Sequence, residues 1–386
     1  MERQVVHMDL DAFYVSCTLL KMPELVGKPL VIGGTSNRGV VTSASYEARK
    51  YGVQAAMPTR LALQRCPDAI VLKGDFDLFT QYSNIVNEII AESVPLHERA
   101  SIDEFYLDMT GMDKFFGSHQ FTKELVHKVY QETGLTMSFG LSVNKTVAKM
   151  CTNYSKPKGS LFIERREVQP FLDPQSIKNL PSLGEVTYKL LRRISIKIIH
   201  TLRQIPSESM QELLGKNGVS LWKKANGIDQ SPVIPYCISQ SISTEKTFDK
   251  DTQDIKELKA LLLAMVEKVA FQLRDKSLMC SVVKVRIRYA NRDTETAQKK
   301  IGFTSNDEVL IQCAHELFDK LYQRRMLLRL VGVKLSGLVR GNHQIDLFHD
   351  NVKMIHLYQA MDRMKRRFDD PTLIRRATGL SAYERY

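Results

Sequence analysis

The sequence has no apolar run long enough to cross a membrane. A spanning helix needs about 18 or more consecutive apolar residues. The longest uninterrupted run, ALLLAMV, covers only residues 260–266 and is typical of a core helix. The N-terminus also lacks the basic start, apolar middle and small-residue cleavage site of a signal peptide. We therefore expect a cytoplasmic protein with no membrane partner.

Paired cysteines are missing as well. Thiol-based zinc sites and disulfide frameworks need clustered cysteines, usually with a CxxC spacing. No CxxC pair occurs here, so the sequence argues against both. We expect buried thiols at all six cysteines, which are Cys17, Cys66, Cys151, Cys237, Cys280 and Cys313.

Acidic residues are in deficit overall, but not at the start of the chain. The net charge is +12, yet residues 1–110 have 10 Lys and Arg against 14 Asp and Glu, whereas residues 111–239 have 18 against 10. A basic later part is typical of polyanion binding, and an acidic first third suits a metal centre. Charge alone leaves a basic protein without nucleic acid equally open.

The length of 386 residues predicts two to four domains. Strand-like and helix-like segments alternate over residues 3–165, which favours an α+β core resembling a ferredoxin-like sheet. Residues 166–230 have a helical, short-looped pattern. The linker-like DQSPVIPYCISQSIS then leads to a second α+β unit. There the strand VVKVRIRY alternates apolar residues with three basic residues on the opposite face, Lys284, Arg286 and Arg288.

Acidic residues form two short groups in the first part of the chain. Asp9 and Asp11 end a predicted strand, where the two-residue period puts both on one face. Asp103 and Glu104 are adjacent within a predicted strand pair, in SIDEF. Adjacent ionised carboxylates in a half-buried sheet repel each other unless a cation compensates. Such a set suits Mg²⁺ and two-metal phosphoryl transfer; the alternatives are helix caps or a solvated acidic turn.

Five motifs carry a family resemblance: MDLDAFYVSCT, SYEARKYGV, ASIDEFYLDMTG, GLSVNKTVAKM and SKPKG. In this order and spacing they resemble the Y-family, or translesion, DNA polymerases, and among them the bacterial DNA polymerase IV type. The similarity runs from residue 5 to about residue 348. It implies an α+β multidomain, right-hand polymerase with a ferredoxin-like palm, small fingers, a helical thumb with a helix-hairpin-helix, and an α+β little finger.

The resemblance also implies domain boundaries. The palm would be formed by residues 1–12 and 75–165, and the fingers by 13–74. The thumb would cover 166–231, the linker 232–243 and the little finger 244–343. Residues 344–386 would hold a clamp-binding motif and a C-terminal tail with the helix-like LYQAMDRMKRRF. Many polymerase IV chains end near the clamp motif, so the tail is a departure that either covers the motif, binds DNA or binds a partner.

Roles in the active site follow from the same resemblance. Asp9 and Asp103 match the metal-binding aspartates, Glu104 matches the catalytic carboxylate that also ligates metal, and Leu10 would offer its backbone carbonyl. Asp11 matches no metal ligand, which leaves it a structural role. The implied cofactors are two Mg²⁺ ions, for which Mn²⁺ can substitute. The implied nucleotide-binding residues are Phe13, the steric gate Tyr14, Thr42 near the templating pair, Tyr46 and Arg49 on one helix face, and Lys156.

DNA-binding residues are implied further along the chain. LPSLGEVTYKLL resembles the thumb hairpin and keeps Gly184, although Ser182 replaces the first of the two glycines in the family pattern. The basic face of Lys284, Arg286 and Arg288 would follow the DNA backbone in a salt-sensitive, sequence-independent manner. For any one of these residues, a solvated strand face is the plain alternative.

A short peptide near the C-terminus resembles a sliding-clamp ligand. In QIDLF, residues 344–348, the matching residues are Gln344, Leu347 and Phe348, and Ile345 replaces Leu. Its position just past the predicted little finger strengthens the match. A second departure lies in SKPKG, where Lys158 stands at a position that is usually Asn or Asp in the family.

The expected function is template-directed, low-fidelity translesion DNA synthesis. A monomeric enzyme would bind primer–template DNA and dNTPs, transfer nucleotides to the primer 3′-OH, and reach the nucleoid when the sliding clamp recruits it. The alternatives are a polymerase V-type catalytic subunit that needs partner proteins, a palm-fold nucleotidyl cyclase, and an inactive DNA-binding relative. MDLDAFY and SYEARKYG favour the polymerase IV type. The basic later segments argue against a cyclase, and the three carboxylates argue against an inactive relative.

Overall fold

The computed structural model of the chain describes residues 2–112, 117–235, 239–341 and 352–368. It divides into two compact units at residues 237 and 238. Within the described ranges, no helix is long and apolar enough to span a membrane. Cys237 lies outside the described residues. The expected buried thiols are confirmed for the other five cysteines, which are free and buried: Cys17, Cys66, Cys151, Cys280 and Cys313.

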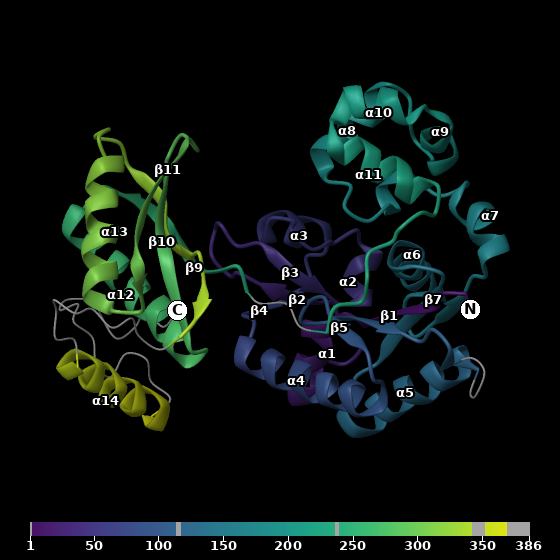
Figure 1. Cartoon of the computed structure of the whole chain (residues 1–386), viewed down its shortest axis with the longest axis horizontal. Helices are drawn as coiled ribbons and strands as arrows, with labels where there is room; N and C mark the ends of the chain where they lie inside the picture. The colour runs from purple at the N-terminus through teal and green to yellow at the C-terminus, as the bar shows by residue number, and fades with distance from the viewer. Residues whose placement is uncertain (1, 113–116, 236–238, 342–351, 369–386) are drawn as a thin grey trace. The chain divides into compact units, whose positions relative to one another are not determined.

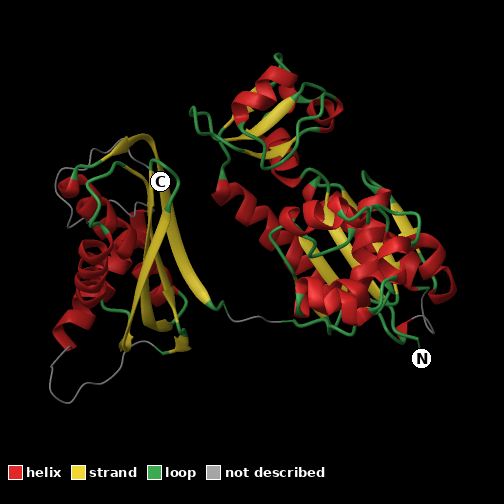
Figure 2. Ribbon diagram, turned by 90° about the horizontal axis from the view of Figure 1, so that it is seen from above, coloured by secondary structure: helices red, strands yellow, loops and turns green. Residues whose placement is uncertain are grey.

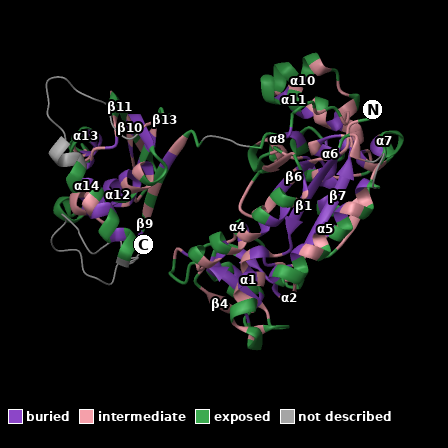
Figure 3. Cartoon of the chain, turned by 60° about the horizontal axis from the view of Figure 1, so that its bottom comes forward, coloured by how far each residue is buried: buried purple, intermediate pink, exposed green. Residues whose placement is uncertain are grey.

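A five-stranded sheet of order β5-β6-β1-β7-β8 forms the centre of the first unit. The central strand pairs antiparallel with a neighbour on each side, and all six of its residues are buried, as Figure 3 shows. This arrangement agrees with the expected ferredoxin-like core. The strands are β1 (Val5–Leu10), β5 (His97–Arg99), β6 (Glu104–Asp108), β7 (Met137–Ser142) and β8 (Ser160–Phe162).

Helices cover both faces of this sheet (Figure 1). Val6 and Met8 of β1 pack into the core shared with two of them, whereas His7 points to the opposite face and contacts Thr152 of the third. That third helix comes so close to β7 that a Cβ at Gly140 would clash with its backbone, so the position needs glycine. The three helices are α4 (Phe76–Ser93) and α5 (Ser118–Thr133) on one face and α6 (Lys145–Ser155) on the other.

A smaller sheet of order β3-β2-β4 follows β1 in the chain. Two of its strands, in KPLVIGG and GVVTSAS, belong to the alternation of strands and helices expected over residues 3–165, and α2 confirms the helix expected for Tyr46 and Arg49. That helix begins where the Ser45 side chain accepts a hydrogen bond from the Ala48 backbone N–H. The elements are β2 (Leu30–Gly33), β3 (Val41–Ala44), β4 (Ile70–Leu72), α1 (Phe13–Lys21), α2 (Tyr46–Lys50) and α3 (Thr59–Arg65).

Short helices follow the sheets, as the sequence predicted for residues 166–230. Their apolar side chains share one core with α6, which includes Leu172, Leu191 and Leu202. The core therefore ties this helical region to the sheet that holds Asp9. The helices are α7 (Val168–Leu172), α8 (Glu185–Arg193), α9 (Ile199–Gln204), α10 (Ser207–Leu214) and α11 (Lys216–Ala225).

A four-stranded antiparallel sheet of order β11-β10-β12-β9 dominates the second unit, with two helices packed against one face (Figure 2). Val283, Val285 and Ile287 are fully buried in that core, which confirms the predicted alternation. The first strand begins at Ser241, three residues before the expected domain start at residue 244. The elements are β9 (Ser241–Thr252), β10 (Leu278–Tyr289), β11 (Thr294–Thr304), β12 (Leu328–Ser336), β13 (Val339–Arg340), α12 (Ile255–Asp275) and α13 (Asp307–Leu321).

Helix α14 (Val352–Phe368) belongs to the second unit and packs against it. The largely buried guanidinium of Arg274 in α12 bridges Asp307 of α13 and Asp362 of α14, with N–O distances of 2.5 and 2.7 Å. The Tyr358 hydroxyl donates a hydrogen bond to the Asn306 side chain at 3.0 Å. This part of the predicted C-terminal tail therefore packs onto the second unit.

Candidate active site

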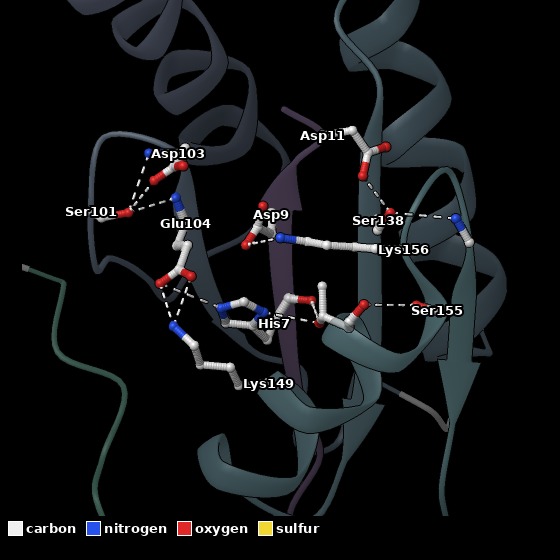
Figure 4. A network of polar contacts seen from close by, with 12 residues as sticks. His7, Asp9, Asp11, Ser101, Asp103, Glu104, Ser138, Lys149, Ser155 and Lys156 are labelled. Atoms are coloured by element: carbon white, nitrogen blue, oxygen red, sulfur yellow. Dashed lines mark hydrogen bonds and ion pairs between the residues drawn. The ribbon is translucent and has the colours of Figure 1, made fainter. Parts of the chain in front are cut away.

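Two of the three predicted acids of the site lie opposite each other on adjacent strands of the central sheet. Asp9 on β1 lies opposite Glu104 on β6. Asp103 was expected within a strand, but it lies in the bend just before β6. The Leu10 backbone N–H donates to the Asp103 carbonyl at 3.0 Å, and the Ser101 hydroxyl donates to the Asp103 carboxylate at 2.6 Å. The first bond holds the bend against the end of β1, and the second, drawn in Figure 4, lies within the bend.

Lys156 holds the Asp9 carboxylate. It follows the last residue of α6, and its Nζ lies 2.6 Å from Asp9 Oδ2. Asp9 is almost completely buried, with a side chain 6% exposed. Burial raises the pKa of Asp9 to about 7, although Lys156 acts in the opposite direction. This carboxylate therefore depends on a nearby cation for its negative charge.

Lys149 holds the Glu104 carboxylate in the same way. Its Nζ donates to both carboxylate oxygens, at 2.7 and 2.6 Å. Burial alone would raise the pKa of Glu104, but contacts with His7 and Lys149 outweigh burial and lower it. Because His7 is itself neutral at pH 7, the compensating positive charge comes from Lys149. Glu104 is thus ionised without any added cation.

His7 forms the buried floor beneath Glu104. Its Nδ1 lies 2.9 Å from the Thr152 hydroxyl, and its Nε2 lies 3.9 Å from Glu104 Oε2, beyond hydrogen-bond distance. Burial lowers the pKa of His7 to about 4. A neutral imidazole therefore lies between Glu104 and Thr152, beside the direct contact of Lys149 with the carboxylate.

One pocket of about 520 Å³ brings the predicted residues together. Its lining contains all three proposed metal-binding acids and most of the predicted nucleotide contacts. The exception is Tyr46, which does not line it. The predicted residues in the lining are Asp9, Leu10, Phe13, Tyr14, Thr42, Arg49, Asp103, Glu104 and Lys156.

The aromatic wall of the pocket is braced by α4. The Tyr14 ring lies 4.6 Å from Phe79 and 5.8 Å from Phe76, centroid to centroid, and Phe13 lies 5.5 Å from Tyr14. Phe79 is fully buried. The Tyr14 ring therefore has a fixed support on the side of the core.

The two residues of α2 that are predicted to bind the triphosphate, Tyr46 and Arg49, make different contacts. The Arg49 guanidinium lies 4.6 Å from the Tyr46 ring centroid, and its Nε donates to the Ala44 carbonyl at 2.9 Å. The Tyr46 hydroxyl instead faces Asp11 at 3.5 Å. Arg49 is thus the member of the pair that reaches the pocket.

Asp11 has the contacts of a structural residue. It is 2% exposed, and its carboxylate accepts hydrogen bonds from the Ser138 hydroxyl at 2.7 Å and from the Lys158 backbone N–H at 3.0 Å. Because β1 ends at Leu10, Asp11 lies beyond the strand rather than on its face with Asp9. It ties the end of β1 to β7 and to the loop after α6.

Sequence reasoning missed Lys149 and His7. Lys149 lies within the motif GLSVNKTVAKM, and His7 directly precedes MDLDAFYVSCT, but neither residue was assigned a role. Lys145 and Lys149 lie four residues apart, which puts them on one face of α6; Lys145 Nζ contacts Glu98 at 2.5 Å. This spacing was the available signal that one face of the helix meets acidic residues.

The donor set fits a divalent cation. Carboxylate oxygens are the ligands that hard cations such as Mg²⁺ prefer, and three carboxylates line the pocket. In the part of the chain that the structure describes, no three Asp, Glu, His or Cys side chains converge closely enough to ligate one ion. The reason is local: the ammonium groups of Lys156 and Lys149 each hold one carboxylate.

The predicted thumb hairpin keeps its turn despite the loss of a glycine. Ser182 has a φ of +73°, in the left-handed region, where glycine is usually favoured. The Lys224 ammonium donates to the Ser182 hydroxyl at 2.8 Å. Gly184 directly precedes α8, and no side chain caps that helix N-terminus. Its first backbone N–H groups suit a phosphate contact.

The basic face of β10 lies on the side of the sheet away from the helices. Lys284, Arg286 and Arg288 are half-buried. Arg286 pairs with Glu245 at 3.1 Å, and Arg288 Nε donates to the Thr294 hydroxyl at 3.0 Å. The three positions share one face, but two of them already have neighbours within the sheet. The predicted clamp-binding residues Gln344, Leu347 and Phe348 lie outside the described residues.

Solved structures define the class of the fold. A Y-family DNA polymerase chimera, Dbh-Dpo4(243-245)-Dbh, matches with a TM-score of 0.77 at 26% identity, covering 88% of this chain and 100% of that chain. DinB from Sulfolobus solfataricus matches with a TM-score of 0.61, at the same identity and coverage. The fold is that of a right-hand Y-family DNA polymerase.

Family models and curated relatives then assign the chain to a protein family. The impB/mucB/samB family model matches residues 8–153, and the model of the family's C-terminal domain matches residues 239–347. DNA polymerase IV of Dehalococcoides mccartyi is 33% identical over 95% of both chains. That of Clostridium kluyveri is 32% identical over 96% of both. The chain belongs to this family and is a DNA-directed DNA polymerase of the DinB type.

This assignment decides among the classes that the sequence left open. The relatives are DNA polymerases IV, so a nucleotidyl cyclase is excluded and the polymerase V type loses its support. The enzyme carries out translesion DNA synthesis on primer–template DNA with dNTPs, and polymerases of this family use divalent metal ions.

Proposed function

We propose that the chain copies DNA with low fidelity, by a two-metal nucleotidyl transfer at Asp9, Asp103 and Glu104, and that the sliding clamp recruits it as a monomer. The observation that carries the proposal is the shared pocket, where these three carboxylates face an aromatic wall and two basic side chains. Mg²⁺, or Mn²⁺ in its place, would bind at the carboxylates and the Leu10 carbonyl. When bound, such ions acidify the primer 3′-OH and neutralise the triphosphate.

The remaining pocket residues would select and orient the nucleotide. Lys156 and Arg49 are the cations of the pocket lining and would hold the triphosphate, with Arg49 suited to paired contacts. The Tyr46 ring would pack against the Arg49 guanidinium and support it. The Tyr14 ring, fixed by α4, would leave no room for a 2′-hydroxyl. Thr42, a small exposed residue on β3, would leave space over the templating pair.

Contacts to the duplex would come from backbone groups and basic side chains. The N-terminus of α8 after Gly184 would meet a phosphate, and Lys284, Arg286 and Arg288 would follow the backbone of the duplex. None of these contacts reads a base edge, so binding would be sequence-independent and salt-sensitive.

Primer extension tests the catalytic assignment. The double variant Asp103→Ala with Glu104→Ala should lose extension with Mg²⁺ and dNTPs by about 1000-fold or more, because transition-state charge is left unneutralised. Asp108→Ala is the matched control, since it removes an acid from the other end of β6, and it should extend as the wild type does. Equal extension by the double variant would refute the proposal.

A further inference from the structure

Lys156 contacts one anionic partner, Asp9, and lines the pocket where the proposed function places a second, the triphosphate. Its Nζ lies 2.6 Å from Asp9 Oδ2, an oxygen that the proposed metal site needs. The same side chain lines the pocket together with Arg49, where a triphosphate would lie. To hold a phosphate further out in the pocket, the ammonium would have to leave the nearly buried carboxylate of Asp9.

The geometry allows Lys156 to exchange partners. Its side chain is 25% exposed, whereas the Asp9 side chain is 6% exposed. The lysine therefore reaches Asp9 from the open side of the pocket. Lys149 differs, because it contacts both oxygens of Glu104 and is not among the pocket-lining residues. Among the described lysines, Lys156 is the one that both contacts a proposed metal ligand and lines the pocket proposed to receive the nucleotide.

We propose that Lys156 couples nucleotide loading to metal loading at Asp9, an inference that rests on the proposed function. Without nucleotide, its ammonium competes with a divalent cation for Asp9 Oδ2. An incoming triphosphate draws the ammonium away, and one positive charge is thereby removed from beside Asp9. The cation binds more tightly as a result. By thermodynamic linkage, bound cation must strengthen triphosphate binding by the same factor.

Binding of Mn²⁺ alone, followed by its EPR signal in the nucleotide-free protein, tests the competition without any turnover. Lys156→Met should bind Mn²⁺ about tenfold more tightly than wild type, because the competing ammonium is gone. The matched control is Lys158→Met. It removes the same charge two residues away on an exposed side chain, and its affinity should stay within about twofold of wild type. Unchanged or weaker binding by Lys156→Met overturns the proposal.

A second measurement separates this coupling from the metal-site assignment. The half-saturating free Mg²⁺ concentration for primer extension should fall as dNTP rises in the wild type, and should not depend on dNTP in Lys156→Met. A dependence that persists in Lys156→Met overturns the coupling. If Asp103→Ala with Glu104→Ala binds Mn²⁺ as tightly as wild type, the proposed metal site itself is wrong. Wild-type protein that binds Mn²⁺ but extends no primer contradicts the proposed function and leaves the Lys156 result standing.

Discussion

Asp9 and Glu104 are opposite each other on β1 and β6, and each carboxylate is held by a different lysine. Both lysines come from the same segment, one within α6 and one directly after it. The acids of the polymerase site are therefore placed by the sheet and balanced by a helix on its second face. This relationship sets what substitutions in and near the pocket should do.

The Tyr14 ring should decide which sugar is accepted. Tyr14→Ala removes the ring braced by Phe79 and Phe76, so a 2′-hydroxyl no longer meets a steric barrier. The ratio of kcat/KM for dNTP over rNTP should fall about 100-fold or more, a loss of nearly 3 kcal/mol of discrimination. Tyr51→Ala, at an exposed position outside the pocket lining, should keep the wild-type ratio. An unchanged ratio in Tyr14→Ala would contradict the steric-gate role.

His7 should make the metal-free protein less stable in acid. The folded-state pKa of His7 is lowered to about 4, below the unfolded value of about 6.5. As the pH falls from 6.5 to 4, the unfolded state gains a proton that the folded state does not bind, so the free energy of unfolding decreases by about 3 kcal/mol.

Urea unfolding in chelator at several pH values measures this effect. His7→Asn keeps a polar atom near Thr152 but cannot titrate, so its free energy of unfolding should lose that part of the pH dependence. The exposed His127 provides the control, because His127→Asn should follow the wild-type curve. Parallel curves for His7→Asn and wild type would rule out a buried neutral imidazole.

The attachment of α14 should depend on its buried ion pair. Asp362→Ala leaves Arg274, 13% exposed, with Asp307 as its acidic partner, and should destabilise the packing of α14 by about 3 kcal/mol. Hydrogen exchange at the α14 amides should speed up accordingly. Asp275→Ala removes the exposed Arg366–Asp275 pair on the same helix contact and should cost less than about 1 kcal/mol. Equal exchange rates in the two variants would show that Arg274 does not anchor the helix.

The peptide at residues 344–348 should carry the response to the clamp. Deleting it should abolish stimulation by a loaded sliding clamp on a primed circular template, while basal extension on a short linear template stays unchanged. Asp346→Ala, at a position to which the resemblance assigns no residue, should retain stimulation. Clamp stimulation that survives the deletion would exclude this motif as the binding site.

The order of helices and strands was predictable because it depends on local sequence patterns. Most of the pocket residues were predictable because they lie in recognisable motifs. Alternation fixed the buried face of β10, and the ordered motifs brought Asp9 and Glu104 into one site. The counter-ions were not predictable, because nothing in the sequence pairs Lys149 with Glu104 until the crossing of α6 over β1 is known.

Other differences between the predictions from the sequence and the structure also arise from tertiary contacts. Asp103 falls outside β6 in a bend, where its backbone N–H and that of Glu104 donate to the Ser101 hydroxyl. The Tyr46 hydroxyl is taken up by Asp11, a contact between the fingers and the palm that helical spacing cannot reveal. The docking of α14 depends on Arg274, which lies in a distant helix.

Because of the two lysine–carboxylate pairs, folding of the chain does not require bound metal ions. In many small metal-binding domains the ligands repel one another until the ion arrives, so the chain folds only when it is loaded. Here Lys156 and Lys149 already compensate Asp9 and Glu104 inside the folded chain. A newly synthesised molecule can therefore fold completely when metal ions are scarce. It binds the ions that its chemistry requires afterwards.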